Sequence, residues 1–467
     1  MTAGRTRFDR FDRFDRFDRF DRFDRFDGAM AAAAAAAGCL IVWLGLGLTF
    51  FWDEWEFIAS RSLGDPMTWF TPHNEHWSTI PVLLYRSLVE TVGLRSYVPY
   101  HALLVGIHLV VAVAVYVLVR RTSGPWLALV GGALVLLFGS GFENLFWAFQ
   151  IGFTGTTALC LTALLVLDGP PTRRRVPLLL GLLLAGLATS GFGLAMAVVV
   201  GTEVLLRPPW RRHAWILAVG AAAFGAWFLL IGRTGLGLQG NPFSLGSLVN
   251  VPRTVVEGIG TSAGALTGLG PVLGIVPGLA VYVLAVRRAL ERTLPVRAAG
   301  CLLGIVALYA IVGLARTANP QGYGDAPRLA YFSGPLLLVA IAAMVGRPSW
   351  PPVGSYARPI AVTSVAVMLV LSAAWNIVLL TRGRDLFVQR ADITRALLTV
   401  ELAPDRRGQF DRSRPLALVP SANVLETIVA RYGSPLRDSL AAVPPVSAGA
   451  LAKAERYLLD GGPIPVP

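Results

Sequence analysis

The sequence is poor in charge for its length. Only 15% of its 467 residues are charged, whereas soluble domains carry about 25%. Of its 41 basic residues only Lys453 is a lysine, and the rest are arginines. The three cysteines, Cys39, Cys160 and Cys301, stand alone inside apolar runs. Their spacing excludes a disulfide framework and a cysteine-based metal site, and the low charge argues against a soluble enzyme.

Long apolar runs take the place of charge. Hydrophobic residues make up 54% of the chain and recur in runs along most of its length. A helix of about 20 apolar residues crosses the roughly 30 Å of bilayer hydrocarbon. We therefore expect an all-α polytopic membrane protein with about eleven transmembrane helices. The predicted spans are 30–51, 98–119, 125–139, 147–167, 176–188, 191–206, 214–232, 270–286, 298–315, 329–346 and 359–381.

Arginines gather in the connections between these runs. The clusters are Arg120 with Arg121, then 173–175, 207–212 and 287–292. All fall on one side if the N-terminus is cytoplasmic, because arginine-rich loops stay in the cytoplasm. The Arg, Ala, Gly and Leu bias favours a bacterial source, so we expect a multi-pass bacterial plasma-membrane protein with an extracytoplasmic C-terminus. Topology explains the net charge of +13, and no nucleic acid partner is expected.

The two ends of the chain differ from its middle. Residues 1–28 are dominated by a repeated Arg-Phe-Asp triplet, which predicts a low-complexity tail because a period of three gives no lasting helix face. Residues 29–381 hold the predicted spans. Residues 382–467 mix charges with short apolar stretches and close in a proline-rich run. They predict a small extracytoplasmic C-terminal segment.

The first outer loop opens with a cluster of acids. Asp53, Glu54 and Glu56 follow the first span among four aromatic residues in 51–57. A partly desolvated carboxylate at a membrane boundary has a raised pKa, which suits a general base. The alternative is a solvated helix end within the aromatic belt of the membrane interface. The clustering favours function, with Asp53 and Glu54 as catalytic candidates.

A second group of polar residues lies further along the same loop. His73, Glu75 and His76 occur within the run Pro-His-Asn-Glu-His-Trp, and we interpret them as substrate-binding residues. Two histidines three residues apart could also hold a divalent metal, but the spacing is not that of the HExxH zinc motif. No metal ligand is therefore assigned, and a divalent metal is the one cofactor that stays open.

Further candidates lie on the other outer loops. Glu143 is the one acid of the short second loop, and an acid at membrane level is costly unless it is paired. It is the third catalytic candidate. Arg316 and Arg328 stand at the outer boundary, against the usual arginine bias, with Tyr331 just inside the next helix. These three could bind an anion such as a lipid phosphate; the alternative is a salt bridge to Asp325 or to lipid head groups.

This arrangement resembles the GT-C superfamily of membrane glycosyltransferases, which includes the protein O-mannosyltransferase and aminoarabinose transferase families. The likeness covers the architecture of residues 30–381, with Asp53 and Glu54 opening a long outer loop and Glu143 in the next. It implies a polyprenyl-phosphate-linked sugar donor and inverting transfer to a glycan, lipid or protein acceptor at the outer face. By this likeness Asp53 would be the base, Glu143 the second acidic position, and Arg328 would hold the phosphate.

Two other classes stay open. A transporter or lipid flippase would place charges deep in its spans and show repeated halves. Here the candidate charges lie at outer helix ends, and no convincing repeat occurs outside the N-terminal tail. The third class is a non-catalytic envelope-assembly protein. A nucleotide-dependent enzyme is disfavoured, because the chain has no GxxxxGK[ST] loop and no convincing dinucleotide fingerprint.

Overall fold

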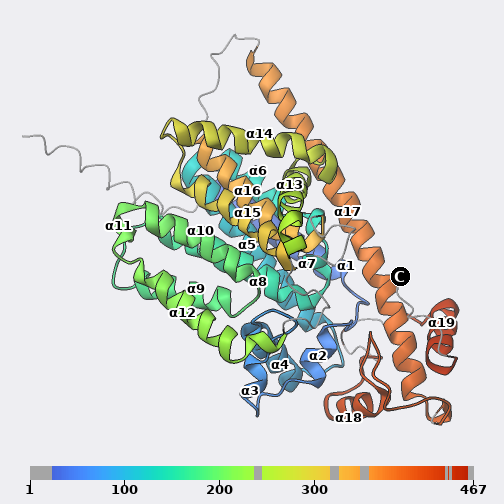
Figure 1. Ribbon diagram of the computed structural model, residues 1–467. Coiled ribbons are helices and arrows are strands. Elements are labelled where there is room, and N and C mark those ends of the chain that lie inside the picture. The colour runs from blue at the N-terminus through green and yellow to red at the C-terminus, as the bar shows by residue number, and fades with distance from the viewer. Residues whose placement is uncertain are drawn as a thin grey trace, which may run out of the picture.

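The described part of the protein is built from helices. The computed structural model describes residues 24–235, 245–315, 325–347, 357–406, 408–436, 440 and 444–460. Within these ranges the one β-type contact is an isolated antiparallel bridge between His73 and His76. The expectation of an all-α membrane protein is confirmed to this extent (Figure 1).

Seven helices of the described residues are long and apolar enough to cross a membrane. They are α1 (Arg25–Leu44), α5 (Val98–Ser123), α8 (Ile151–Leu167) taken together with η3 (Ala148–Gln150) before it as the span Ala148–Leu167, α14 (Gly270–Leu290), α15 (Val296–Ala315), α16 (Pro327–Val345) and α17 (Ala357–Leu402), whose span is Val362–Leu402. Four shorter apolar helices accompany them, namely α6 (Pro125–Leu136), α9 (Arg175–Leu187), α10 (Phe192–Leu206) and α12 (Trp215–Leu230). The protein is thus a multi-pass helical membrane protein.

Each predicted apolar run coincides with one of these helices, but their lengths divide them. The four shorter ones have 12, 13, 15 and 16 residues. At 1.5 Å per residue these span about 18–24 Å, which is less than the roughly 30 Å of hydrocarbon. Seven crossings are therefore supported. A total of eleven stays a prediction, as does the side of the membrane on which each loop lies.

Helix α13 (Leu245–Thr267) corresponds to no predicted span. It carries polar residues, including an exposed ion pair of Arg253 with Glu257 at 2.7 Å, so its apolar run is broken. Glycines let it lie against α14 at close range. A Cβ on Gly264 would lie 2.1 Å from the Gly270 carbonyl oxygen, and one on Gly274 would lie 2.2 Å from that of Gly260. Backbone contact of this kind needs small residues, which the hydropathy pattern does not reveal.

Buried ion pairs join several helix ends at one end of the bundle. Arg297, which is 5% exposed, pairs with Asp168 at 2.9 Å and also with Glu203. Asp168 lies 2.6 Å from Arg121, and Glu203 lies 2.5 Å from Arg207. These contacts link the ends of α5, α8, α10 and α15. The arginine clusters at these ends therefore share one end of the bundle, and part of their charge is neutralised there.

The opposite end carries short helices and both outer loops. The elements there are α2 (Glu54–Ala59), α3 (Met67–Phe70), α4 (Thr79–Thr91), η2 (Gly139–Gly141), α7 (Glu143–Phe146), η3 (Ala148–Gln150) and η4 (Gly232–Gly235). The remaining short helix between α10 and α12 is α11 (Pro208–Arg211), at the arginine-rich end.

Helix α17 runs unbroken past residue 381, where the predicted span ends. Its far part carries η5 (Pro404–Arg406), α18 (Ala422–Tyr432) and α19 (Ala448–Leu459), and α18 lies next to α2 in Figure 1. Tyr432 of α18 donates its hydroxyl to Glu90 of α4 at 2.8 Å, and its carbonyl accepts the Leu94 amide at 2.9 Å. The C-terminal segment is thereby attached to the first outer loop.

The last triplets of the N-terminal repeat belong to α1. Asp24 caps the helix by accepting the amides of Phe26 and Asp27, and Asp27 accepts the Asp24 amide in return. Both acids also pair with Arg120 of α5. Whereas the sequence predicts an inert tail through residue 28, α1 begins at Arg25, because the repeat supplies a reciprocal capping pair there.

The orientation can be tested by cysteine labelling. In a background with Cys39, Cys160 and Cys301 replaced by alanine, single cysteines are introduced as Ser62→Cys in the first outer loop and Thr172→Cys at the arginine-rich end; both positions are exposed. We expect a membrane-impermeant maleimide to label Ser62→Cys in intact cells, and Thr172→Cys only after the membrane is opened, because arginine-rich ends stay cytoplasmic. The reverse pattern would overturn the orientation.

Candidate functional site

Asp53 lies on a strained turn at the outer end of the bundle. The preceding residue, Trp52, has a φ of 50°, which is an outlier for a bulky side chain. The turn is closed by the Glu54 amide, which donates to the Phe51 carbonyl at 3.3 Å, and by the Trp55 amide, which donates to the Trp52 carbonyl at 3.0 Å. It leaves the Asp53 side chain 26% exposed. Asp53 is thus accessible while most of its surroundings are protein.

His73 lies beside Asp53 and contacts a second acid. Its Nε2 is 3.7 Å from Oδ1 of Asp53, and its Nδ1 is 2.7 Å from Oε2 of Glu56. The other oxygen of Glu56 lies 2.5 Å from the buried guanidinium of Arg61, which also donates to three backbone carbonyls within residues 68–72. The His73 imidazole thus lies between two carboxylates, in direct contact with Glu56 and close to Asp53.

Burial and neighbouring charge shift the pKa values of Asp53 and Glu56 in opposite directions. Burial raises the pKa of the Asp53 carboxyl, and the charges of His73 and Arg328 reduce that rise. Burial acts on Glu56 in the same sense, but hydrogen bonding and charge from His73 and Arg61 outweigh it and lower the pKa of Glu56. Asp53 therefore gains basicity, and Glu56 stays ionised.

Two arginines from distant parts of the chain meet at Glu143. Glu143 begins α7, and its Oε2 lies 3.1 Å from Nη1 of Arg328 near the start of α16. Arg390 of α17 lies within electrostatic range of both. Its guanidinium stacks 5.2 Å from the ring centre of Phe51 and 4.9 Å from that of Phe387. Arg390 was not among the predicted site residues. Its local signal is an aromatic residue, Phe387, three positions before it in the sequence.

Glu54 follows Asp53 in the sequence but faces the interior. Its side chain is fully buried. Oε1 accepts the hydroxyls of Tyr85 at 2.5 Å and Tyr97 at 2.8 Å, and Oε2 accepts the Phe51 amide at 2.6 Å. Consecutive residues of a helix point about 100° apart, so only one of the two acids can face outward. Glu54 therefore lies inside the protein and Asp53 at its surface, and a catalytic role for both stays a prediction.

An apolar hollow opens beside Arg328. A volume of about 120 Å³ within it is accessible to water, and Glu75 and His76 contribute polar side chains to it. The two lie close, with His76 Nε2 at 3.8 Å from Glu75 Oε1. Most of the other lining side chains are apolar and come from α8, α10, α12 and α15, including Phe153, Phe192, Leu194, Phe224, Leu308, Ile311 and Val312. Arg328 also lines the hollow, so the hollow extends from these apolar side chains to the ion pair of Arg328 with Glu143.

Tyr331, a predicted binding residue, lies away from these groups. Tyr331 is fully buried one turn deeper in α16 than Arg328, and its hydroxyl lies 2.7 Å from Nδ1 of His108 on α5. It therefore contributes to helix packing in the bundle interior. Arg316 lies outside the described residues.

The two loop histidines do not face one another as metal ligands would. Their backbones pair across a tight turn, with N–O distances of 3.1 and 2.9 Å. The ring of His73 packs on Phe57 beside Asp53, and that of His76 packs on Phe153 in the hollow. Across the described ranges no group of three or more His, Cys, Asp or Glu side chains could hold a metal ion.

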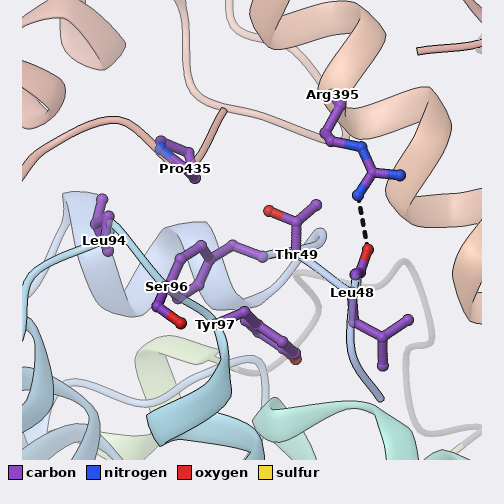
Figure 2. Close-up of a pocket in the computed structure, with 9 residues that line it drawn as sticks. Leu48, Thr49, Leu94, Ser96, Tyr97, Arg395 and Pro435 are labelled. Atoms are coloured by element: carbon purple, nitrogen blue, oxygen red, sulfur yellow. Dashed lines mark hydrogen bonds between the residues drawn. The ribbon is translucent and has the colours of Figure 1, made fainter. Parts of the chain in front are cut away.

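A small void lies where α17 meets the segment after α1 (Figure 2). Arg395 donates to the Gly47 carbonyl at 2.6 Å, and Thr49, Ser96 and Tyr97 line the space below it. Its volume of about 10 Å³ suits roughly one water molecule. The void is too small for a sugar, and the contact attaches α17 to the chain just before Asp53.

The pKa of Glu54 predicts a pH-dependent stability. Burial raises it to about 8 from 4.5, against the opposing hydrogen bonds of Tyr85, Phe51 and Tyr97. Between these values the folded protein holds a proton that the unfolded chain releases, so stability falls as the pH rises. We expect the melting temperature in detergent to drop from pH 5 to pH 8, and Glu54→Gln to flatten that slope. Glu291→Gln, at an exposed ion pair on α14's end, should keep the wild-type slope.

The chain matches no protein-family model, and neither curated proteins nor solved structures show significant similarity to it. The GT-C likeness therefore depends on the arrangement of its own residues.

Proposed function

We propose that the protein is a membrane glycosyltransferase that moves a sugar from a polyprenyl-phosphate donor to an extracytoplasmic glycan, lipid or protein, with inversion. The observation that carries the proposal is the position of Arg328. It lines the apolar hollow, lies 3.1 Å from Glu143, and its charge acts on Asp53. One arginine thus stands between a surface for an apolar chain and a carboxylate able to act as a base.

The proposed step needs a base and a stabilised leaving group. An acceptor hydroxyl is a poor nucleophile until a carboxylate takes its proton. Its oxygen attacks the anomeric carbon on the face opposite the phosphate, the bond from that carbon to the phosphate oxygen breaks, and the proton passes to Asp53. The electron pair leaves on the lipid phosphate, whose charge Arg328 and Arg390 stabilise. Attack from the opposite face inverts the anomeric centre.

Asp53 is the best base among the acids of this site. It is partly exposed, whereas Glu54 is fully buried and Glu143 already pairs with Arg328. Burial raises the pKa of Asp53, which increases its basicity. His73, 3.7 Å away, is placed to receive the proton afterwards.

The hollow fits the lipid part of such a donor. Its lining is mostly apolar, its volume is about 120 Å³, and it opens beside Arg328. It would take the isoprene units nearest the phosphate, while the rest of the chain stays in the bilayer. A transporter or flippase would also need a lipid surface, but it has no use for a base. An envelope-assembly protein needs neither, so transfer activity decides among the three.

The base is tested with Asp53→Asn, which keeps the size of the side chain and removes its basicity. Loss of a general base typically costs about 10²–10⁴-fold in rate, so turnover should fall by that range while melting stays unchanged. Transfer is measured in proteoliposomes with polyprenyl-phosphate-linked hexoses and pentoses. Asp65→Asn serves as the control, because Asp65 is an exposed acid of the same loop. Full activity in Asp53→Asn would remove Asp53 as the base.

The phosphate contact is tested by comparing Arg328→Ala with Arg328→Lys. Alanine should weaken donor use more, since lysine keeps the charge but loses the forked geometry of the guanidinium. A hydrogen bond to a charged group contributes about 1.5–3 kcal/mol, so the donor KM should rise roughly 10- to 100-fold in Arg328→Ala.

The matched control is Arg384→Ala, because Arg384 lies on α17 and pairs with Asp385 at 3.1 Å. Arg390→Ala should resemble Arg328→Ala and differ from this control. Wild-type donor kinetics in both Arg328 and Arg390 variants would exclude the phosphate contact and favour the non-catalytic classes.

A further inference from the structure

A chain of polar groups lies buried beneath the site. The chain of contacts begins at the Phe51 amide, which donates to Oε2 of Glu54 at 2.6 Å. The other oxygen, Oε1, accepts the hydroxyl of Tyr97 at 2.8 Å. The same hydroxyl accepts the Ala148 amide at 2.8 Å. One carboxylate and one phenol therefore connect the segment before Asp53 with the segment after Glu143.

These two segments are far apart in sequence and meet only through tertiary contacts. Residues 51–55 form the turn of Asp53, and residues 143–150 form α7 and η3, which begin at Glu143. The second segment has another anchor, since His101 Nε2 lies 2.6 Å from the Leu145 carbonyl oxygen. Both segments face Arg328, which pairs with Glu143 and acts on Asp53. Their relative position therefore sets the geometry of the proposed site.

The turn of Asp53 needs such an anchor. A bulky residue at positive φ, such as Trp52, persists only where the surroundings over-determine its conformation. The Glu54 carboxylate supplies that constraint from inside, because it binds the Phe51 amide directly before the strained residue. Tyr85 donates to the same carboxylate at 2.5 Å, but among the described residues its hydroxyl makes no hydrogen bond to the second segment.

We propose that Glu54 and Tyr97 are positioning residues: they fix the Asp53 turn against the Glu143 segment and so set the distance between the two acids. This rests on the proposed function, and it assigns Glu54 a role different from that of a second base. Neither residue touches substrate, because both are buried.

Three tyrosine-to-phenylalanine variants separate this role from general destabilisation. Each removes one buried hydroxyl. Tyr97→Phe breaks the contact to both segments, Tyr85→Phe breaks only the contact to Glu54, and Tyr100→Phe breaks a bond to the Gly93 carbonyl at 3.0 Å. Tyr100 is the matched control, since it is fully buried next to Tyr97 and donates to neither Glu54 nor Ala148.

Hydrogen exchange of the full-length protein in nanodiscs gives a readout independent of catalysis. In Tyr97→Phe we expect exchange to rise at least 10-fold in peptides covering both 51–55 and 143–150. In Tyr85→Phe it should rise in 51–55 alone, and in Tyr100→Phe in neither. Glu54→Gln should resemble Tyr97→Phe, because its amide cannot accept three donors. Equal exchange in Tyr97→Phe and Tyr100→Phe would overturn the coupling.

Transfer kinetics complete the test. Tyr97→Phe should lower kcat roughly 10-fold or more, with an unchanged donor KM, because the acids move while the arginines and the hollow stay in place. Raised exchange with a wild-type kcat would overturn the positioning role. Absence of transfer in the wild-type protein, with every donor, would instead overturn the proposed function, and the exchange pattern would still decide whether the two segments are coupled.

Discussion

The high cost of charge in hydrocarbon governs this molecule. An ionised side chain at the centre of a bilayer costs at least about 2.5–3.5 kcal/mol, so charges belong at helix ends or in pairs. At one end Arg297 lies between Asp168 and Glu203 and closes a buried network. At the other end Arg328 lies against Glu143, but Asp53 stays partly exposed. At the first end the buried charges neutralise one another, whereas at the second end the Asp53 carboxylate stays accessible.

The length of each apolar run was enough to predict the helices that are long enough to cross a membrane, because length and apolarity are local properties of the chain. Helix α13 was not predicted, because its contact with α14 depends on glycines such as Gly264 and Gly274. These residues permit close approach of the two helices because they have no Cβ atom. The boundary at residue 381 also missed the continuation of α17, since a helix does not end where its apolar run ends. The seven long helices were thus predictable, and their packing was not.

The site shows the same division between local and tertiary information. The acidic cluster, His73 and Arg328 could be found from composition at the ends of apolar runs, and the structure brings Asp53, Glu143 and Arg328 to one place. Which of two adjacent acids faces outward depends on Tyr85 and Tyr97, which the local pattern cannot place. Arg390 lies almost 250 positions from Glu143 in the sequence, so its place within electrostatic range of Glu143 depends on the tertiary structure.

The length of helix α17 fixes the distance between its membrane part and its C-terminal end. Its 46 residues give a length of about 69 Å, more than twice the hydrocarbon thickness of roughly 30 Å. Arg390 and Arg395 thus lie on the same helix as the part that is expected to cross the bilayer. Their partners, Phe51 and Gly47, belong to the segment that follows α1. One residue inserted between them and the bilayer would turn both arginines by about 100° and shift them by about 1.5 Å. The contacts of these two arginines therefore depend on the number of residues in the helix, and not on which apolar side chains face the lipid.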